Sequence, residues 1–321
     1  MANRSLVTSK ATTLSQLLMF MGCLFIGIFL VGYLLGILVL VPFFSDLSIE
    51  GLINFIQHPT DNWEGRFALL LLQGVTALIG FIVVPLLYLR YFEGRKFGSL
   101  HERKASPLPI FIALVMVLAV MPFMSAVIHW NANLQLPDFL KGFEQAAKAK
   151  EEQLAKLTVF LTNLGSTGEL IFALVVIAVL PGVGEELVFR GVIQKKMTQL
   201  MNPHVAIWVT GFLFSAFHLQ FYGLVPRMLL GVLFGYLYYW SGNLWMPILA
   251  HFLNNGFTLL MIYLYKTGLV SFDLQQVAYG VTVTLLSLVG SVALLWLIRK
   301  LTYRTLEPAD EAAMEYVEEN N

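Results

Sequence analysis

Eight side chains able to take part in chemistry lie in stretches that are otherwise apolar. They are Glu185, Glu186 and Arg190 in LPGVGEELVFRG (180–191), Phe214 and His218 in FLFSAFHLQ (212–220), and His251, Asn254 and Asn255 in MPILAHFLNNGF (246–257). Charged groups at membrane depth are costly and are usually retained for a function. The two neighbouring glutamates among apolar residues therefore indicate a functional or structural role for this stretch.

Helical spacing decides which of these groups share a face. Residues four apart are neighbours on a helix surface, so Glu186 can pair with Arg190, which lowers the cost of both charges. Glu185 lies about 100° round the same helix and is free to face elsewhere. His251 and Asn255 likewise share one stripe. If the three faces converge, one pocket holds a carboxylate, two imidazoles and an amide.

Such a pocket suits hydrolysis of an amide bond by water. A carboxylate can accept a proton from water as general base, and an imidazole or amide can donate hydrogen bonds to the developing oxyanion. Alternatively, one carboxylate and two histidines can bind Zn²⁺ and leave a fourth position for water. No convincing nucleophile is present: Ser215 is not clearly aimed at His218, and Cys23 lies in an apolar run. The Glu186–Arg190 pair also has a purely structural reading, as a clamp between helices.

The composition indicates the setting of this chemistry. Of the 321 residues, 58% are hydrophobic and 12% are charged, whereas soluble domains average about 25% charged. An all-α polytopic membrane protein is expected. The zero net charge gives no reason to expect a nucleic-acid partner, and a single cysteine excludes an intramolecular disulfide and a cysteine-based metal site.

Eight segments are apolar for about the 20 residues that a membrane helix needs. They are 15–43, 67–90, 107–129, 167–188, 204–220, 224–241, 244–265 and 275–298. Placing the N-terminus inside puts thirteen of the 20 Lys and Arg residues in the inside segments. This bias predicts that both termini are cytosolic and that the protein is a multi-pass cell-membrane protein.

The chain divides into segments by these spans. We expect a cytosolic N-terminus (1–14), helices one to three (15–130), an extracytoplasmic amphipathic segment (131–165), helices four to seven (166–266), helix eight (267–305) and an acidic cytosolic tail (306–321). The short breaks within 166–266 favour antiparallel neighbours, so these four helices are expected to form one unit. Pro181, Gly182 and Gly184, just before the glutamates, predict a bend or a close helix approach.

The three stretches resemble a known family. GEELVFRG (184–191), FSAFH (214–218) and HFLNN (251–255) are similar, in order and spacing, to the EExxxR, FxxxH and HxxxN motifs of the CPBP family of CAAX proteases and bacteriocin-processing proteins, also called Abi. The resemblance covers about residues 165–265. It implies an eight-helix intramembrane endopeptidase whose catalytic core is 166–266.

The resemblance also implies roles for the site residues. Glu185 would activate water, His218 would help to hold it, and His251 with Asn255 would stabilise the oxyanion. Glu186 also belongs to the implied catalytic set, where with Arg190 it would shape the site, and Arg190 and Phe214 are the implied structural support. The family name says metalloprotease, which implies zinc on Glu185, His218 and His251, yet a metal-free glutamate mechanism fits equally.

The implied partners are membrane lipid and a membrane-associated protein or peptide. In one branch of the family, the enzyme removes the last three residues of a prenylated CaaX protein, so a C-terminal segment is one implied substrate. Other members are tied to bacteriocin maturation or self-immunity. The competing class is a non-enzymatic protein of the same fold, either a scaffold or a transporter that uses the same residues as a proton relay. A transporter predicts paired broken helices in two halves, and the sequence lacks that pattern.

Overall fold

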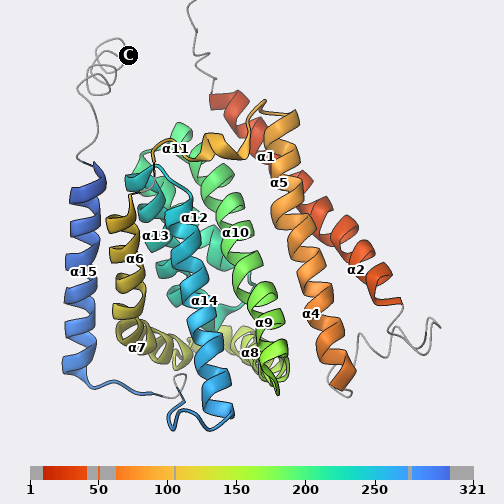
Figure 1. Ribbon diagram of the computed structural model, residues 1–321, viewed down its shortest axis with the longest axis vertical. Coiled ribbons are helices and arrows are strands. Elements are labelled where there is room, and N and C mark those ends of the chain that lie inside the picture. Colours follow the sequence, from red (N-terminus) through yellow and green to blue (C-terminus); the bar gives the residue numbers. More distant parts are fainter. Residues whose placement is uncertain (1–9, 42–49, 51–62, 105, 274–276, 304–321) are drawn as a thin grey trace, which may run out of the picture.

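The computed structural model describes residues 10–41, 50, 63–104, 106–273 and 277–303. Figure 1 shows that these residues form a bundle of helices lying side by side. The described part is 85% helical and contains no strand, only an isolated bridge between His101 and Asn243. The predicted all-α architecture is confirmed.

Among the described residues, six helical stretches are long and apolar enough to cross a membrane. They are Lys10–Leu40 (α1, Lys10–Ile26, and α2, Tyr33–Leu40), Gly65–Tyr91 (from α4, Trp63–Ala77, and α5, Val84–Tyr91), Thr167–Leu200 (α9, Thr167–Leu174, α10, Leu180–Glu186, and α11, Lys195–Leu200), Phe221–Ser241 (with α13, Leu224–Ser241), α14 (Trp245–Lys266) and α15 (Val281–Tyr303). The pair α6 (Pro107–Ala119) and α7 (Met121–Ala132) forms a seventh if it is counted as one bent span. The chain is therefore a polytopic membrane bundle.

The expected count of eight spans stays a prediction. The eighth candidate is α12 (Pro203–Ala216), which has 14 residues. At 1.5 Å per residue it rises about 21 Å, whereas the hydrocarbon core of a bilayer is about 30 Å thick. The apolar run continues to residue 220, but the helix does not.

The bend of 43° between α6 and α7 has a local cause. Pro122 lies in the first turn of α7. It has no N–H to donate to the carbonyl four residues earlier, and its ring crowds that carbonyl. The helix therefore changes direction at Val120 instead of running straight.

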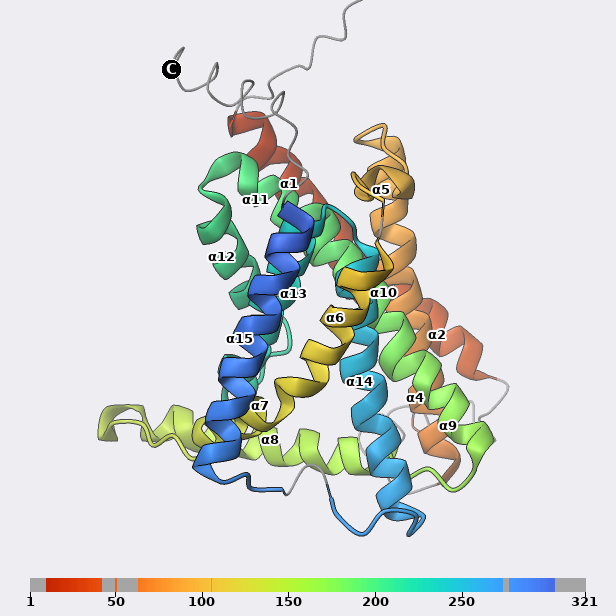
Figure 2. The same cartoon turned by 60° about the vertical axis from the view of Figure 1, so that its left-hand side comes forward.

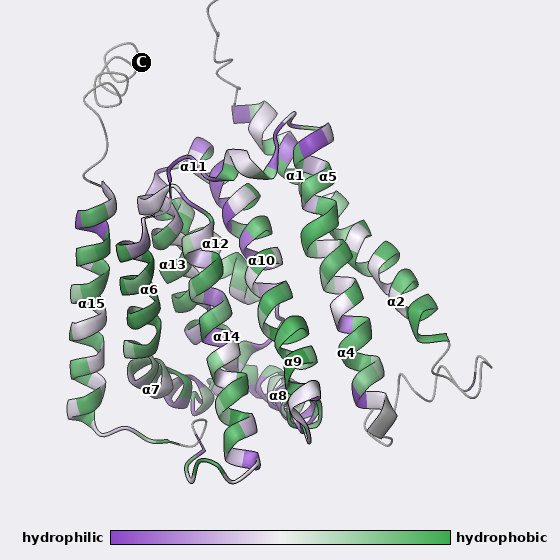
Figure 3. Ribbon diagram, in the orientation of Figure 1, coloured by the Kyte–Doolittle hydropathy of each residue, from purple (hydrophilic) through white to green (hydrophobic). Residues whose placement is uncertain are grey.

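The hydropathy of the bundle surface fits a lipid environment. Figure 3 shows apolar residues along the outward faces of the long helices. On α15, for example, Leu286 and Val289 expose 67% and 66% of their surface. Large apolar side chains so exposed would be costly in water, whereas lipid accepts them.

One helix does not run with the others. Figure 2 shows α8 (Lys141–Leu161) running across the lower part of the bundle, at a steep angle to the long helices. None of its residues is buried. Glu151 of α8 accepts hydrogen bonds from Tyr222 N and Gln220 Nε2, both at 3.0 Å, so α8 is tied to the turn between α12 and α13. The extracytoplasmic placement of 131–165 stays a prediction. Residues 1–9 of the N-terminal segment and the whole tail 306–321 lie outside the described residues.

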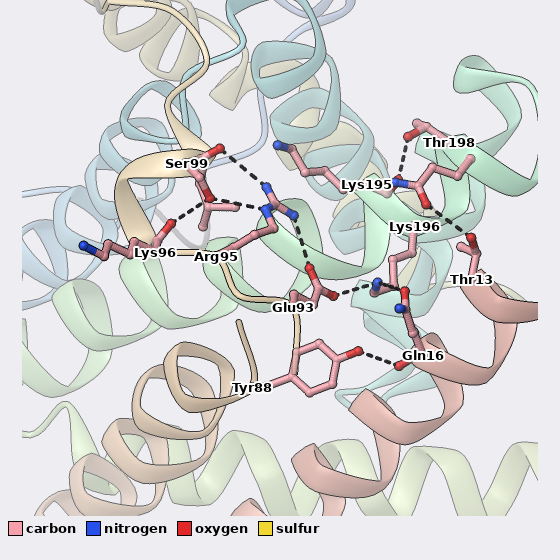
Figure 4. A network of polar contacts seen from close by, with 12 residues as sticks. Thr13, Gln16, Tyr88, Glu93, Arg95, Lys96, Ser99, Lys195, Lys196 and Thr198 are labelled. Carbon is pink, nitrogen blue, oxygen red and sulfur yellow. Dashed lines mark hydrogen bonds and ion pairs between the residues drawn. The ribbon is translucent and has the colours of Figure 1, made fainter. Parts of the chain in front are cut away.

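Polar contacts fasten both ends of the long helix Thr167–Leu200. At one end, Lys196 Nζ lies 2.6 Å from Glu93 Oε1 and donates to Gln16 Oε1 at 2.9 Å, which joins α11 to α5 and α1 (Figure 4). At the other end, Arg66 of α4 pairs with Glu169 at 2.6 Å. The helix that carries the two glutamates is thus held at one end by an ion pair with Arg66 of the second span, and at the other by an ion pair with Glu93, just after that span, and a hydrogen bond to Gln16 of the first span.

Small residues bring the motif-bearing helices close together. A Cβ added at Gly182 would lie 3.2 Å from Phe252 N of α14, and one added at Gly231 of α13 would lie 3.0 Å from the Cα of Gly211 in α12. Membrane helices approach most closely through such residues. The close approach expected at Gly182 is therefore present, and α10, α12, α13 and α14 form one packed unit.

Candidate active site

The first and third motifs meet at a buried histidine. His251 of α14 is 4% exposed, and its Nδ1 lies 2.8 Å from Glu186 Oε1. The same oxygen accepts a hydrogen bond from Arg190 Nη1 at 2.7 Å. A carboxylate paired with Arg190 can only accept, so Nδ1 of His251 must carry the proton of this bond. The imidazole is therefore fixed in orientation, with Nε2 turned away from Glu186.

Arg190 connects this cluster to a third helix. Its side chain is fully buried, and Nη2 donates to the carbonyl oxygen of Gly231 at 2.7 Å. The guanidinium also lies over the rings of Phe214 and Phe234, at 4.9 and 5.6 Å from their centroids. Aromatic faces stabilise a desolvated cation. Phe234 in turn stacks on His251 at 5.1 Å.

The two glutamates have different surroundings. Glu186 has no exposed surface, whereas the side chain of Glu185 is 17% exposed. Glu185 Oε2 lies 3.8 Å from His251 Nε2, which is too far for a direct hydrogen bond. Glu185 is thus the carboxylate that a water or substrate can reach, and it faces the free nitrogen of the oriented histidine.

Phe214 links the second motif to the other two. Its ring lies edge-on to His218 at 5.6 Å and to His251 at 5.9 Å. His218 follows the end of α12, and the next residue, Leu219, has a left-handed backbone with φ of 53°. Such a conformation is uncommon for a residue with a branched side chain. The chain thus turns directly after His218, whose imidazole reaches His251 through the ring of Phe214 that contacts them both.

Asn255 has partners of its own. Its Nδ2 donates to the carbonyl of Ile177 at 3.2 Å, and its Oδ1 accepts from Asn254 Nδ2 at 3.1 Å. These bonds leave one amide hydrogen of Asn255 for another acceptor. The oxyanion role expected for this residue stays a prediction, and the bonds show a second function, which is to join α14 to the helix that bears the glutamates.

A zinc site requires at least three ligating side chains grouped around one point. The Nδ1 bond from His251 to Glu186 is the arrangement that commonly orients a metal-binding imidazole. However, among the residues that the structure describes, no three His, Cys, Asp or Glu side chains are grouped so as to hold a metal ion. As placed, Glu185 and His251 would supply two ligands, and His218 does not complete the set.

Several groups in this site have no mark in the sequence. Gly231 contributes a backbone carbonyl, and Phe234 is an aromatic residue among many in an apolar helix. Only the packing of α13 against Leu187–Gln194, the segment that contains Arg190, reveals them. By contrast, the i, i+4 spacing was sufficient to predict the pair Glu186–Arg190, which the structure contains.

Comparison with known proteins finds a family to which this region is similar. Residues 167–257 match the family described as type II CAAX prenyl endopeptidase Rce1-like, and the match includes all three motifs. A stretch of 73 residues is 32% identical to the uncharacterized protein YpbD of Bacillus subtilis (strain 168), covering 22% of this chain and 34% of that relative. The aligned region thus spans about a third of the relative. No solved structure matches the chain.

Proposed function

Since residues 167–257 form an Rce1-like domain, consistent with the CPBP family, we propose that the protein is an intramembrane endopeptidase that hydrolyses a peptide bond with water activated by Glu185. The observation that carries the proposal is the asymmetry of the glutamates. Glu186 is buried and bonded to Arg190 and His251, whereas Glu185 is reachable and lies 3.8 Å from His251 Nε2.

The proposed reaction uses these groups in order. A water molecule held between Glu185 and His218 attacks the scissile carbonyl carbon and gives its proton to Glu185. The carbonyl oxygen becomes an oxyanion, which accepts hydrogen bonds from His251 Nε2–H and the free amide hydrogen of Asn255. The C–N bond then breaks, and the proton on Glu185 passes to the leaving amine. The products are a carboxylic acid and an amine, as hydrolysis requires.

The buried cluster positions His251 for this reaction. Nδ1–H is bonded to Glu186, which directs Nε2 toward the site. Donation from Nε2 to the oxyanion requires a proton there as well, so the proposed role needs the imidazolium form. Arg190 and Phe214 act on the substrate only through His251, because Arg190 is fully buried and Phe214 lies between Arg190 and the imidazole rings. They are therefore positioning residues in this proposal.

A zinc-assisted reaction is the alternative within the same function. Zinc held by Glu185, His218 and His251 would supply a bound water of lowered pKa and would polarise the carbonyl. His218 would have to move closer to the other two ligands for this. The two versions differ in metal content, which can be measured directly.

We further propose that the substrate is a membrane-associated protein or peptide cleaved near its C-terminus. The protein would work as a multi-pass cell-membrane protein with both termini in the cytosol. The description of the matching family as a CAAX prenyl endopeptidase supports this substrate class, and the apolar outer face supports a site reached from lipid.

The test is cleavage of a farnesylated, internally quenched CaaX-type peptide by the purified full chain in proteoliposomes. We expect Glu185→Gln and His218→Ala each to abolish cleavage while the protein keeps its elution profile and melting temperature. We expect His251→Ala to abolish cleavage and also to lower the melting temperature, because it removes a buried hydrogen-bond partner of Glu186. A control is Lys148→Gln, which removes an exposed ion pair with Glu144 on α8 and should cleave normally. Full biological activity of all three site variants would reject the peptidase and favour the scaffold alternative.

A further inference from the structure

A cavity of about 700 Å³ lies at the end of the bundle opposite α8. Its lining comes largely from the connection that follows α5, from α11, from the first residue of α12 and from the last turns of α13 and α15. Figure 2 shows these four helices lying together at that end. The volume falls in the range of about 300–1,000 Å³ typical of ligand pockets, and no residue proposed for catalysis is among the described residues that line it.

The cavity carries an excess of positive charge. Three of its lining side chains are cationic: Arg95, Arg103 and Lys195. Among the described residues its lining has one carboxylate, Glu102, which pairs with Lys195. Glu93, which lies 3.3 Å from Arg95, is shared with Lys196 at the shorter distance of 2.6 Å. The charges of this cavity therefore suit an anionic ligand.

The cationic groups keep donors for such a ligand. Arg95 makes three hydrogen bonds of 3.2–3.4 Å, two to Ser99 and one to Glu93 (Figure 4), which leaves two of its five N–H groups. Lys195 has three donors and pairs with Glu102. The side chains of Arg95 and Lys195 are 30% and 18% exposed. Both are thus partly sheltered in the fold and still reachable by a ligand.

An exposed apolar face begins directly beside the cavity. Pro203, the first residue of α12, belongs to the lining. Val205, Trp208 and Phe212 of the same helix expose 51%, 45% and 48% of their surface, and their spacing of three and four residues places them on one face. A cationic cavity at a helix end followed by an apolar stripe matches the two parts of a phospholipid, a charged headgroup and its acyl chains.

We propose that this cavity binds the headgroup of an anionic phospholipid and that Arg95 and Lys195 donate to its phosphate oxygens. The inference goes beyond the proposed peptidase function and does not depend on it. Phosphate is a preferred acceptor for guanidinium and ammonium groups, and basic pockets between membrane helices bind anionic headgroups. A zwitterionic headgroup would bring a cation of its own into a cavity that already has excess positive charge, so a lipid of net negative charge is selected.

The experiment counts the lipids that the full chain retains. The protein is taken from nanodiscs made of equal parts phosphatidylglycerol and phosphatidylcholine, transferred to mild detergent and measured by native mass spectrometry. We expect phosphatidylglycerol to be retained about tenfold over phosphatidylcholine, as hydrogen bonds to a charged group predict. The double variant Arg95→Gln/Lys195→Gln should lose this preference. It should fold, because Glu93 keeps Lys196 and the side chain of Glu102 is 58% exposed.

A matched control separates this cavity from general surface charge. Lys148→Gln/Lys156→Gln removes the same number of cations from ion pairs on α8, at the other end of the bundle, and should keep the full preference. An equal loss in both double variants would overturn the proposal, and so would equal retention of the two lipids by the wild type. If Arg95→Gln/Lys195→Gln does not fold, the single variant Arg95→Gln takes its place and should lower the preference several-fold; an unchanged preference would then overturn the proposal.

Two other anions are distinguished by further arms. Inorganic phosphate shares the chemistry of the headgroup: if an excess of it displaces phosphatidylglycerol from the wild type, the site belongs to a soluble phosphate and the proposal is overturned. The acidic segment 306–321 is the other candidate. Changing its six Asp and Glu residues to the matching amides should leave retention unchanged, whereas phosphatidylglycerol that binds only after this change would assign the cavity to that segment and overturn the proposal.

Discussion

Replacing Arg190 with methionine should destabilise the protein strongly, because it leaves a buried carboxylate without its cation. Arg190 makes two hydrogen bonds of 2.7 Å, to Glu186 and to Gly231, and two ring contacts. After the substitution, Glu186 keeps one bond, from His251, and its Oε2 has no partner even in the intact protein. Removing one partner of a buried ion pair typically costs about 3–5 kcal/mol.

That cost corresponds to a change of roughly 100- to 5,000-fold in the unfolding equilibrium. It can be measured by reversible unfolding in mixed micelles, with circular dichroism as the signal. The double variant Glu186→Gln/Arg190→Met has no buried charge at these positions and should recover most of the loss. The double variant should nevertheless stay poorly active, because the loss of the carboxylate that orients an imidazole typically lowers activity about 10- to 100-fold.

The matched control is Arg66→Met. Its ion pair with Glu169 is 15% and 38% exposed on the two side chains, so its loss should cost only about 0–1 kcal/mol. The reasoning fails if Arg190→Met is as stable as the wild type, or if the double variant is no more stable than the single one. Either result would mean that water or backbone rearrangement satisfies Glu186 without Arg190.

Three further predictions concern the chemistry and the packing. Glu185→Gln should abolish cleavage and change the free energy of unfolding by no more than about 0.5 kcal/mol, because the side chain is partly exposed; a variant that still cleaves would refute its role as base. If the reaction is zinc-assisted, elemental analysis should give about one zinc per chain in the wild type and none in His218→Ala. Full activity in strong chelator with no detectable metal would reject the zinc-assisted reaction. Gly231→Ala should destabilise by about 1–3 kcal/mol through overpacking against Gly211, whereas Gly290→Ala, which meets nothing within 4 Å, should be neutral; equal melting temperatures would contradict this.

The sequence was informative where the physics is local. Apolar runs predicted the membrane helices, and spacing within one helix predicted the pair Glu186–Arg190. Helix ends were predicted less well. The fourth apolar run ends at residue 188, yet the helix continues to Leu200, because the charged residues there, such as Lys196, find partners on neighbouring helices. Charge ends an apolar run without ending a helix.

Contacts between helices could not be predicted in the same way. We expected the polar faces of the three motif-bearing helices to converge, and Glu185 does lie 3.8 Å from His251 Nε2, but the hydrogen-bond partners were not predictable. The structure places His251 in direct contact with Glu186, and Asn255 on the carbonyl of Ile177. These pairings depend on the rotation of α14 against α10, which is set by tertiary packing at positions such as Gly182. Sequence periodicity indicates that a helix has a polar face, but it does not indicate which residues of a neighbouring helix contact that face.

The bond from Arg190 to the carbonyl of Gly231 affects how sequences of this kind should be interpreted. In lipid the hydrophobic effect does little to drive one helix against another, so hydrogen bonds between helices contribute much of what fixes their relative positions. A descendant that lost catalysis would still need Glu186 and Arg190 to keep its helices in place. The presence of this pair in a sequence therefore indicates the helix packing and does not by itself indicate catalysis. Glu185, which bonds to none of these structural partners, is the position at which a working enzyme and an inactive copy would differ.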